Sequence, residues 1–146
     1  MKFFFINTQN LVILFLIFLD QYTKAYVETN RSSFSIIPNY LRINYTKNTG
    51  AAFGIASGST TLLIIISAII CTALFAYIMW RTLNHKKNRL GLWLILAGGI
   101  GNLIDRIVRG YVVDFIDVPV IPTFNIADIC ITLRSYIIYF FRIYFC

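Results

Sequence analysis

Acidic residues are scarce in this chain. Only six Asp and Glu side chains stand among 146 residues, against 13 Lys and Arg, for a formal net charge of +7. The basic residues lie at the edges of long apolar runs, as membrane-interface anchors do, and form no stripe that would follow a nucleic acid. Nucleic-acid binding is therefore not expected, and we read the single histidine, His85, as a solvated loop residue beside lysines rather than a catalytic base.

Cysteine is also rare and shows no paired spacing. Cys71, Cys130 and Cys146 each lie in an apolar run. A disulfide framework or a zinc site needs cysteines at recurring short intervals, so neither is indicated. We expect no metal, and the cysteines read as small buried hydrophobic residues.

What the chain has in abundance is apolar sequence. With 58% hydrophobic and only 13% charged residues it is far more apolar than an ordinary soluble domain. About 20 apolar residues at ~1.5 Å each cross a ~30 Å hydrocarbon core. We predict an all-α membrane protein, a single polytopic domain over residues 1–146, whose four transmembrane helices lie at about 8–27, 60–80, 90–108 and 123–145.

The first of these helices has a second interpretation, a cleavable secretory signal. No A-x-A site follows it, and Asp20 stands where the cleavage region would begin, so an uncleaved helix is favoured. Orientation follows from the loop 81–89, whose dense basic residues predict a cytoplasmic location. With four spans, both termini are then cytoplasmic.

The segment between the first two spans has a different period. Leu41, Ile43 and Tyr45 alternate with polar residues, which is typical of a half-buried strand. The glycines and alanines of residues 48–54 favour a turn back toward the bilayer. We predict a small extracytoplasmic, β-rich interfacial segment at about 34–54.

Several polar residues interrupt the spans, where a buried charge is costly and marks a site or a pair. Asp20 and Lys24, four residues apart, predict an intrahelical ion pair at the membrane surface. Asn102 and Arg106 share a helix face, either as interfacial anchors or as hydrogen-bond supports beside a carboxylate site. Asp105 lies about 100° further round that helix, and we expect it to point elsewhere and pair locally.

The stretch YVVDFIDVPVIPTFNIAD holds half of the acidic residues. Taken singly, Asp114 and Asp117 are loop residues, and Asp128 is an acidic residue in the first turn of a helix capped by Thr123 or Asn125. Taken jointly, Asp114 and Asp128 can converge at the lipid–water boundary. Two close carboxylates do not both ionise cheaply, which supplies an acid and a base that activate water, the chemistry of an aspartyl peptidase.

Five short blocks carry a family resemblance. In order and spacing they resemble the signature blocks of the lipoprotein signal peptidases, also called signal peptidase II, over about residues 11–131. The blocks are DQYTK (20–24), NTGAAFG (48–54), GGIGNLIDR (98–106), VVDF (112–115) and FNIAD (124–128).

The resemblance implies an aspartyl endopeptidase of the bacterial plasma (inner) membrane, with its active site near the outer face. Such an enzyme removes the signal peptide from diacylglyceryl-modified prolipoproteins, just before the lipidated cysteine. It uses no metal or cofactor, contacts membrane lipid, and binds globomycin-type inhibitors. The implied catalytic pair is Asp114 and Asp128. The implied substrate-binding or supporting residues are Asn48, Asn102, Arg106, Asn125 and Asp20.

One departure from the family pattern stands after FNIAD. Arg134 occupies a position where the family normally has a small residue, within an aromatic-rich tail that reads as a diverged helix or a frame-altered end. Two alternative functions stay open from the sequence. One is a catalytically inactive relative that binds lipoprotein precursors, and the other is a small proton-coupled transporter component.

Overall fold

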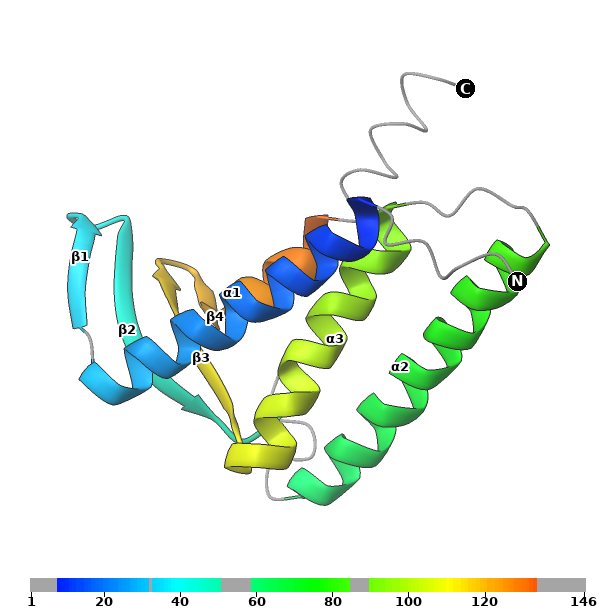
Figure 1. Ribbon diagram of the computed structural model, residues 1–146. Helices are drawn as coiled ribbons and strands as arrows, with labels where there is room; N and C mark the ends of the chain where they lie inside the picture. Colours follow the sequence, from blue (N-terminus) through cyan, green and yellow to red (C-terminus); the bar gives the residue numbers. More distant parts are fainter. Residues whose placement is uncertain (1–7, 32, 51–58, 85–89, 134–146) are drawn as a thin grey trace.

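Three long helices and a four-stranded sheet make up the described part of the chain (Figure 1). The computed structural model describes residues 8–31, 33–50, 59–84 and 90–133. A further helical segment, residues 126–133, follows the last strand and is called the 126–133 helix below. The labelled elements are α1 (Thr8–Asn30), β1 (Ser33–Ile37), β2 (Leu41–Asn48), α2 (Thr60–Leu83), α3 (Leu90–Arg109), β3 (Val112–Val118) and β4 (Ile121–Phe124).

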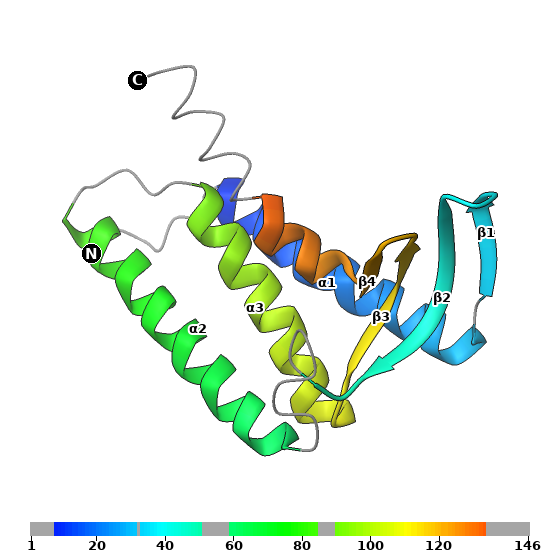
Figure 2. The same cartoon turned by 180° about the vertical axis from the view of Figure 1, so that it is seen from behind.

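Helix α3 lies between α1 and α2, and Figure 2 shows the same order from behind. α2 and α3 are long and apolar enough to cross a membrane. α2 leaves most of its apolar side chains exposed, as a helix facing lipid would. α1 covers the first predicted span but is not one of these two helices. Of the fourth predicted span, the structure describes the residues up to 133.

The sheet is antiparallel in the order β1-β2-β3-β4. β1 and β2 fall within the predicted segment 34–54, and exposure alternates along β2 from Leu41 to Tyr45 as expected. β3 and β4 were not predicted, so the all-α description is too narrow. The fourth span was also placed too early, because residues 123–124 belong to β4 and the helix begins at 126.

The reason for the miss lies in β3 itself. Its first four residues, 112–115, are all buried, so the strand shows no alternation of apolar and polar side chains. A short apolar run of this kind cannot be distinguished from a helical one by periodicity. Asp117 is consequently a strand residue rather than a loop residue. It lies opposite Arg42 of β2 and forms an ion pair with it at 3.0 Å.

Three glycines let other elements approach α3 closely. A Cβ on Gly98 would collide with the carbonyl oxygen of Ala127 in the 126–133 helix. A Cβ on Gly101 would lie 2.8 Å from Asp20 Oδ2 of α1, and one on Gly99 would lie 2.8 Å from Cys71 Sγ of α2. The lack of side chains on α3 therefore sets the distance to its neighbours.

The neighbouring glycines 98 and 99 provide a matched test. Gly98→Ala is expected to lower the free energy of unfolding by about 1 to 3 kcal/mol, because backbone atoms of the 126–133 helix must move. Gly99→Ala should change it by less than about 1 kcal/mol, since a single side-chain sulfur can shift and alanine favours the helix. Thermal unfolding in detergent measures both, and equal losses would contradict the packing described here.

Candidate active site

The 126–133 helix begins with a reciprocal pair of hydrogen bonds. The backbone N–H of Asp128 donates to Asn125 Oδ1 at 3.0 Å, and the backbone N–H of Asn125 donates to Asp128 Oδ2 at 3.2 Å. This is a capping box, in which a cap residue and the residue three positions later satisfy each other's free N–H groups. The box fixes the carboxylate of Asp128 beside the first turn of the helix.

Asp114, on β3, is 2% exposed and lies among apolar neighbours. Asn125 Nδ2 donates to Asp114 Oδ1 at 2.7 Å. Asn48 Nδ2, at the end of the adjacent strand β2, donates to Asp114 Oδ2 at 2.9 Å. Both carboxylate oxygens of this buried group are thus matched by amide donors.

Asn102 of α3 holds the second carboxylate. Its Nδ2 donates to Asp128 Oδ1 at 2.8 Å, while its Oδ1 accepts from Asn125 Nδ2 at 3.1 Å. Asn125 therefore contacts Asp114, Asp128 and Asn102 at once. The structure brings together both predicted carboxylates and three of the predicted supporting residues, Asn48, Asn102 and Asn125.

The two carboxyl groups lie in different surroundings. Burial raises the pKa of Asp114 to about 6, and the nearby charge of Asp128 pushes it in the same direction. The hydrogen bonds from Asn48 and Asn125 act against that rise by stabilising the ionised form. Asp128 is only half-buried. The pair can thus hold one proton at mildly acidic pH, on the more deeply buried partner.

For Arg106, the structure shows a hydrogen bond to the backbone near the pair rather than to its carboxylates. Its Nη1 donates to the backbone carbonyl of Asn102 at 3.4 Å. The guanidinium is attracted by the charges of Asp128, Asp105 and Asp114. Arg106 therefore contributes positive potential beside the site, which favours ionised carboxylates.

Asp20 is close to the 126–133 helix but belongs to a separate buried group. Its Oδ1 accepts the backbone N–H of Ala127 at 2.9 Å, so it satisfies one free N–H at the start of that helix. Its Oδ2 lies 2.8 Å from Lys24 Nζ. The predicted ion pair exists, and it is buried within the protein, because Lys24 is 0% and Asp20 2% exposed.

Asp105 joins this group and makes it a cluster across α1 and α3. Asp105 Oδ2 lies 2.9 Å from Lys24 Nζ and also accepts the backbone N–H of Val113. Asp105 Oδ1 lies 2.6 Å from Arg109 Nη1, a local pair as expected, and Arg109 Nε lies 2.9 Å from Glu28 Oε2. We call Asp20, Lys24, Asp105, Arg109 and Glu28 the buried ion cluster.

Sequence reasoning missed this cluster as a unit. It treated Asp20 with Lys24 and Asp105 with its local partner as separate pairs. The available signal was that charges of opposite sign recur at four-residue spacing on two apolar helices, which favours a shared interface. His85 and Arg134 lie outside the described residues, as do residues 51–54 of the NTGAAFG block.

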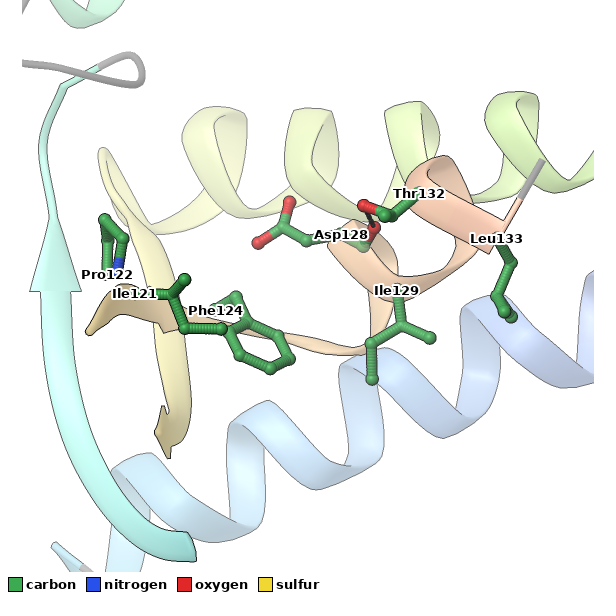
Figure 3. A pocket seen from close by; sticks show the side chains of 7 residues that line it. All are labelled: Ile121, Pro122, Phe124, Asp128, Ile129, Thr132 and Leu133. Atoms are coloured by element: carbon green, nitrogen blue, oxygen red, sulfur yellow. Dashed lines mark hydrogen bonds between the residues drawn. The ribbon is translucent and has the colours of Figure 1, made fainter. Parts of the chain in front are cut away.

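An apolar pocket of about 330 Å³ lies beside Asp128 (Figure 3). Asp128 is the only acidic residue among those that line it. Thr132, the other polar lining residue, donates its hydroxyl to the backbone carbonyl of Asp128 at 2.8 Å. The pocket can hold an apolar group next to a carboxylate. The lining residues are Ile121, Pro122, Phe124, Asp128, Ile129, Thr132 and Leu133.

The fold resembles solved structures of membrane enzymes. Two of them are each described as a bacterial membrane enzyme structure obtained by the in meso method. One superposes with a TM-score of 0.81 at 38% identity, covering 93% of this chain and 87% of that chain. The other gives 0.77 at 35% identity, covering 97% and 96%. The class that the fold defines is therefore a membrane enzyme, in agreement with the two long apolar helices.

Sequence comparison narrows this class. Residues 12–145 match the family described as Signal peptidase (SPase) II. Lipoprotein signal peptidases of Staphylococcus aureus, among them those of strains JH9 and Newman, are 40% identical to this chain over 139 residues, covering 90% of this chain and 85% of each relative. The chain belongs to the signal peptidase II family.

The protonation of Asp114 can be measured directly. The infrared C=O band of its protonated carboxyl, assigned by difference from Asp114→Asn, should disappear with a midpoint near pH 6. Asn48→Ala removes a donor to the ionised form, so the pKa of Asp114 and the midpoint should rise. Thr46→Ala is the control, because Thr46 lies opposite Asp114 on β2 but bonds the Asn44 carbonyl instead. A fall of the midpoint in Asn48→Ala would contradict the geometry.

Proposed function

We propose that this chain is a lipoprotein signal peptidase in which Asp114 and Asp128 form the catalytic pair. The observation that carries the proposal is the position of Asn125, which hydrogen-bonds both carboxylates. Its side-chain Nδ2 donates to Asp114 and its backbone N–H donates to Asp128, and one residue can do both only if the two carboxyl groups lie close together. Membership of the signal peptidase II family supplies the reaction, which is hydrolysis of a signal-peptide bond.

The chemistry follows from the unequal burial of the pair. Asp128, ionised and partly exposed, takes a proton from a water molecule lying between the carboxyl groups. The resulting hydroxide attacks the scissile carbonyl carbon, while protonated Asp114 donates its proton to the carbonyl oxygen. The tetrahedral intermediate collapses, its hydroxyl proton returns to Asp114, and the proton on Asp128 passes to the leaving amine. Both carboxyl groups then regain their starting states.

The amides have distinct tasks in this scheme. Asn48 and Asn125 hold the oxygens of Asp114, and Asn102 holds Asp128 Oδ1. Because Asn48 and Asn125 stabilise the ionised form of Asp114, they limit how far burial raises its pKa. The proton can then leave Asp114 during the reaction and be regained afterwards.

The substrate we propose is a diacylglyceryl-modified prolipoprotein cut just before its lipidated cysteine. The apolar pocket beside Asp128 supports an apolar group of the substrate at that place. We propose a multi-pass protein of the bacterial plasma membrane with both termini in the cytoplasm, supported by the dense basic residues of the loop 81–89. The site then lies near the outer face, in contact with membrane lipid and open to globomycin-type inhibitors.

Neither of the two alternative functions includes cleavage of a lipoprotein precursor. Each carboxylate oxygen of Asp114 and Asp128 accepts a hydrogen bond, so the described surroundings of the pair do not favour an inactive binding relative. A proton-coupled transporter component is not favoured, because the family is one of peptidases. Cleavage of a precursor by the purified chain is the deciding observation.

Asp114→Asn and Asp128→Asn should each reduce prolipoprotein cleavage by about 10³-fold or more, as expected when a residue of a concerted catalytic pair is lost. A gel-shift assay with a diacylglyceryl-modified precursor in detergent measures the rate. Asp117→Asn is a matched control on the same strand, because it removes only a surface ion pair with Arg42. It should cleave at the unmutated rate.

Two results would overturn this assignment. One is full cleavage by either dyad variant, and the other is no cleavage by the unmutated, folded chain. Inhibition by EDTA that is reversed by a metal would show that the two carboxyl groups do not act alone.

The pocket is tested by a second pair of neighbours. Ile121→Ser removes apolar surface from the pocket and should raise KM about tenfold with little change in kcat. Val120→Ser is the control, because Val120 is fully exposed in the preceding turn and is not a lining residue. Steady-state kinetics on the lipidated precursor distinguish the two variants. Equal KM values for Ile121→Ser and Val120→Ser would show that the substrate does not bind in this pocket.

A further inference from the structure

The ammonium of Lys24 has no exposed surface and three acceptors around it. Asp20 Oδ2 lies at 2.8 Å, Asp105 Oδ2 at 2.9 Å and Asn102 Oδ1 at 3.0 Å. An ammonium has three hydrogens and no acceptor, so all of its bonding capacity is used. Two of the bonds end within the buried ion cluster, and the third leaves it toward the catalytic pair.

The third bond has a directional consequence. A primary amide can present either its oxygen or its NH2 group to a neighbour, and Lys24 can bond only the oxygen. Asn102 must therefore turn its NH2 group away from Lys24, which directs Nδ2 to Asp128 Oδ1 at 2.8 Å. A flipped Asn102 would place its carbonyl oxygen against the carboxylate of Asp128 and repel it.

Asn125 also donates a hydrogen bond to Asn102 Oδ1, but this bond is weaker than the one from Lys24. Its two amide hydrogens are shared among Asp114 Oδ1 at 2.7 Å, Asn102 Oδ1 at 3.1 Å and the Val113 carbonyl at 3.4 Å. The shortest bond goes to Asp114. Lys24 is the charged donor to the Asn102 oxygen, and charge-assisted hydrogen bonds are about twice as strong as neutral ones.

We propose that Lys24 is a positioning residue for catalysis, which fixes the orientation of the Asn102 amide and thereby holds the Asp128 carboxylate in its reactive position. The proposal rests on the proposed function of Asp114 and Asp128. Lys24 is too buried to touch substrate, so it acts only through Asn102 and through its charge.

The charged groups around Lys24 set the direction of the effect. Asp20 from α1 and Asp105 from α3 form ion pairs with Lys24. Arg106 of α3 is a further positive charge, and it interacts with the charges of Asp128, Asp105 and Asp114. The charge of Lys24 also lowers the pKa of Asp114. Without Lys24 the Asp114 carboxyl should bind its proton more tightly, because it loses a stabilising positive charge, and the Asp128 carboxylate should lose an oriented donor.

A purely structural role for Lys24 is the alternative. Lys24 does tie α1 to α3, but a buried ion cluster is often no more stabilising than packed apolar side chains. The bond from Lys24 to Asn102 satisfies the third hydrogen of the ammonium in either role. The two roles differ in what they predict for the pH dependence of cleavage.

The first comparison is Lys24→Met against Lys24→Gln, side chains of similar length of which only Gln carries an N–H donor. Lys24→Met should lower kcat about ten- to a hundredfold, the effect of losing a hydrogen bond to a charged group, with KM little changed. The acidic limb of the pH–rate profile should move up by about one unit. Lys24→Gln should recover part of kcat.

A second comparison covers the case in which the single variants do not fold. Lys24→Met with Asp105→Asn removes one charge of each sign, so the cluster keeps its net charge. It is compared with Asp105→Asn alone, in which Lys24 still reaches Asn102. Arg109→Gln is the control at the other end of the cluster, remote from Asn102. It should lower Tm but leave kcat and the pH profile unchanged.

The outcomes are separable from those of the proposed function. If the unmutated chain does not cleave, the proposed function fails. If it cleaves, a ten- to hundredfold kcat loss with a shifted acidic limb in the Lys24 variants, and not in Arg109→Gln, supports the inference. Lys24 variants that lose Tm but keep kcat and the unmutated pH profile would overturn it, and so would an equal shift in Arg109→Gln.

Discussion

The ammonium of Lys24, buried between two carboxylates, is the interaction on which the site geometry depends. Removing such a charge from water is costly unless every hydrogen is bonded, so α1 and α3 must keep Asp20, Lys24 and Asp105 in register. The same carboxylates accept the backbone N–H groups of Val113 in β3 and Ala127 in the 126–133 helix. Each element that carries one of the two paired aspartates is thereby hydrogen-bonded to the buried ion cluster.

This arrangement requires close approach, which the glycines of α3 supply. The absence of a side chain at Gly101 leaves room for the Asp20 carboxylate, and Gly98 leaves room for the backbone at Ala127. A bulkier helix would push α1 and the 126–133 helix outward and lengthen the bonds that reach Asp128. The glycines and the buried charges therefore act together, because the glycines allow the short distances between elements that the buried hydrogen bonds and ion pairs require.

Asp114 and Asp128 lie close together but in different environments. Asp114 lies in a fully buried part of β3 with an amide on each oxygen, and its pKa is raised to about 6. Asp128 stands at a helix start, only partly exposed, beside an apolar pocket. A strand and a helix N-terminus impose these different surroundings, and this difference is what the proposed roles of proton donor and proton acceptor require.

The sequence alone indicated the helices, the strand alternation from Leu41 to Tyr45, and the convergence of Asp114 with Asp128, because these follow from local periodicity and short motifs. Only the tertiary structure decided that β3 and β4 are strands, because β3 begins with four buried residues and has no distinguishing period, and β4 has only four residues. The tertiary structure also showed that Asp105 pairs with Lys24 of α1, whereas sequence spacing had assigned it only to a local pair. Its bond to Lys24 joins residues on two helices far apart in the chain, and such long-range pairing depends on packing that no local pattern encodes.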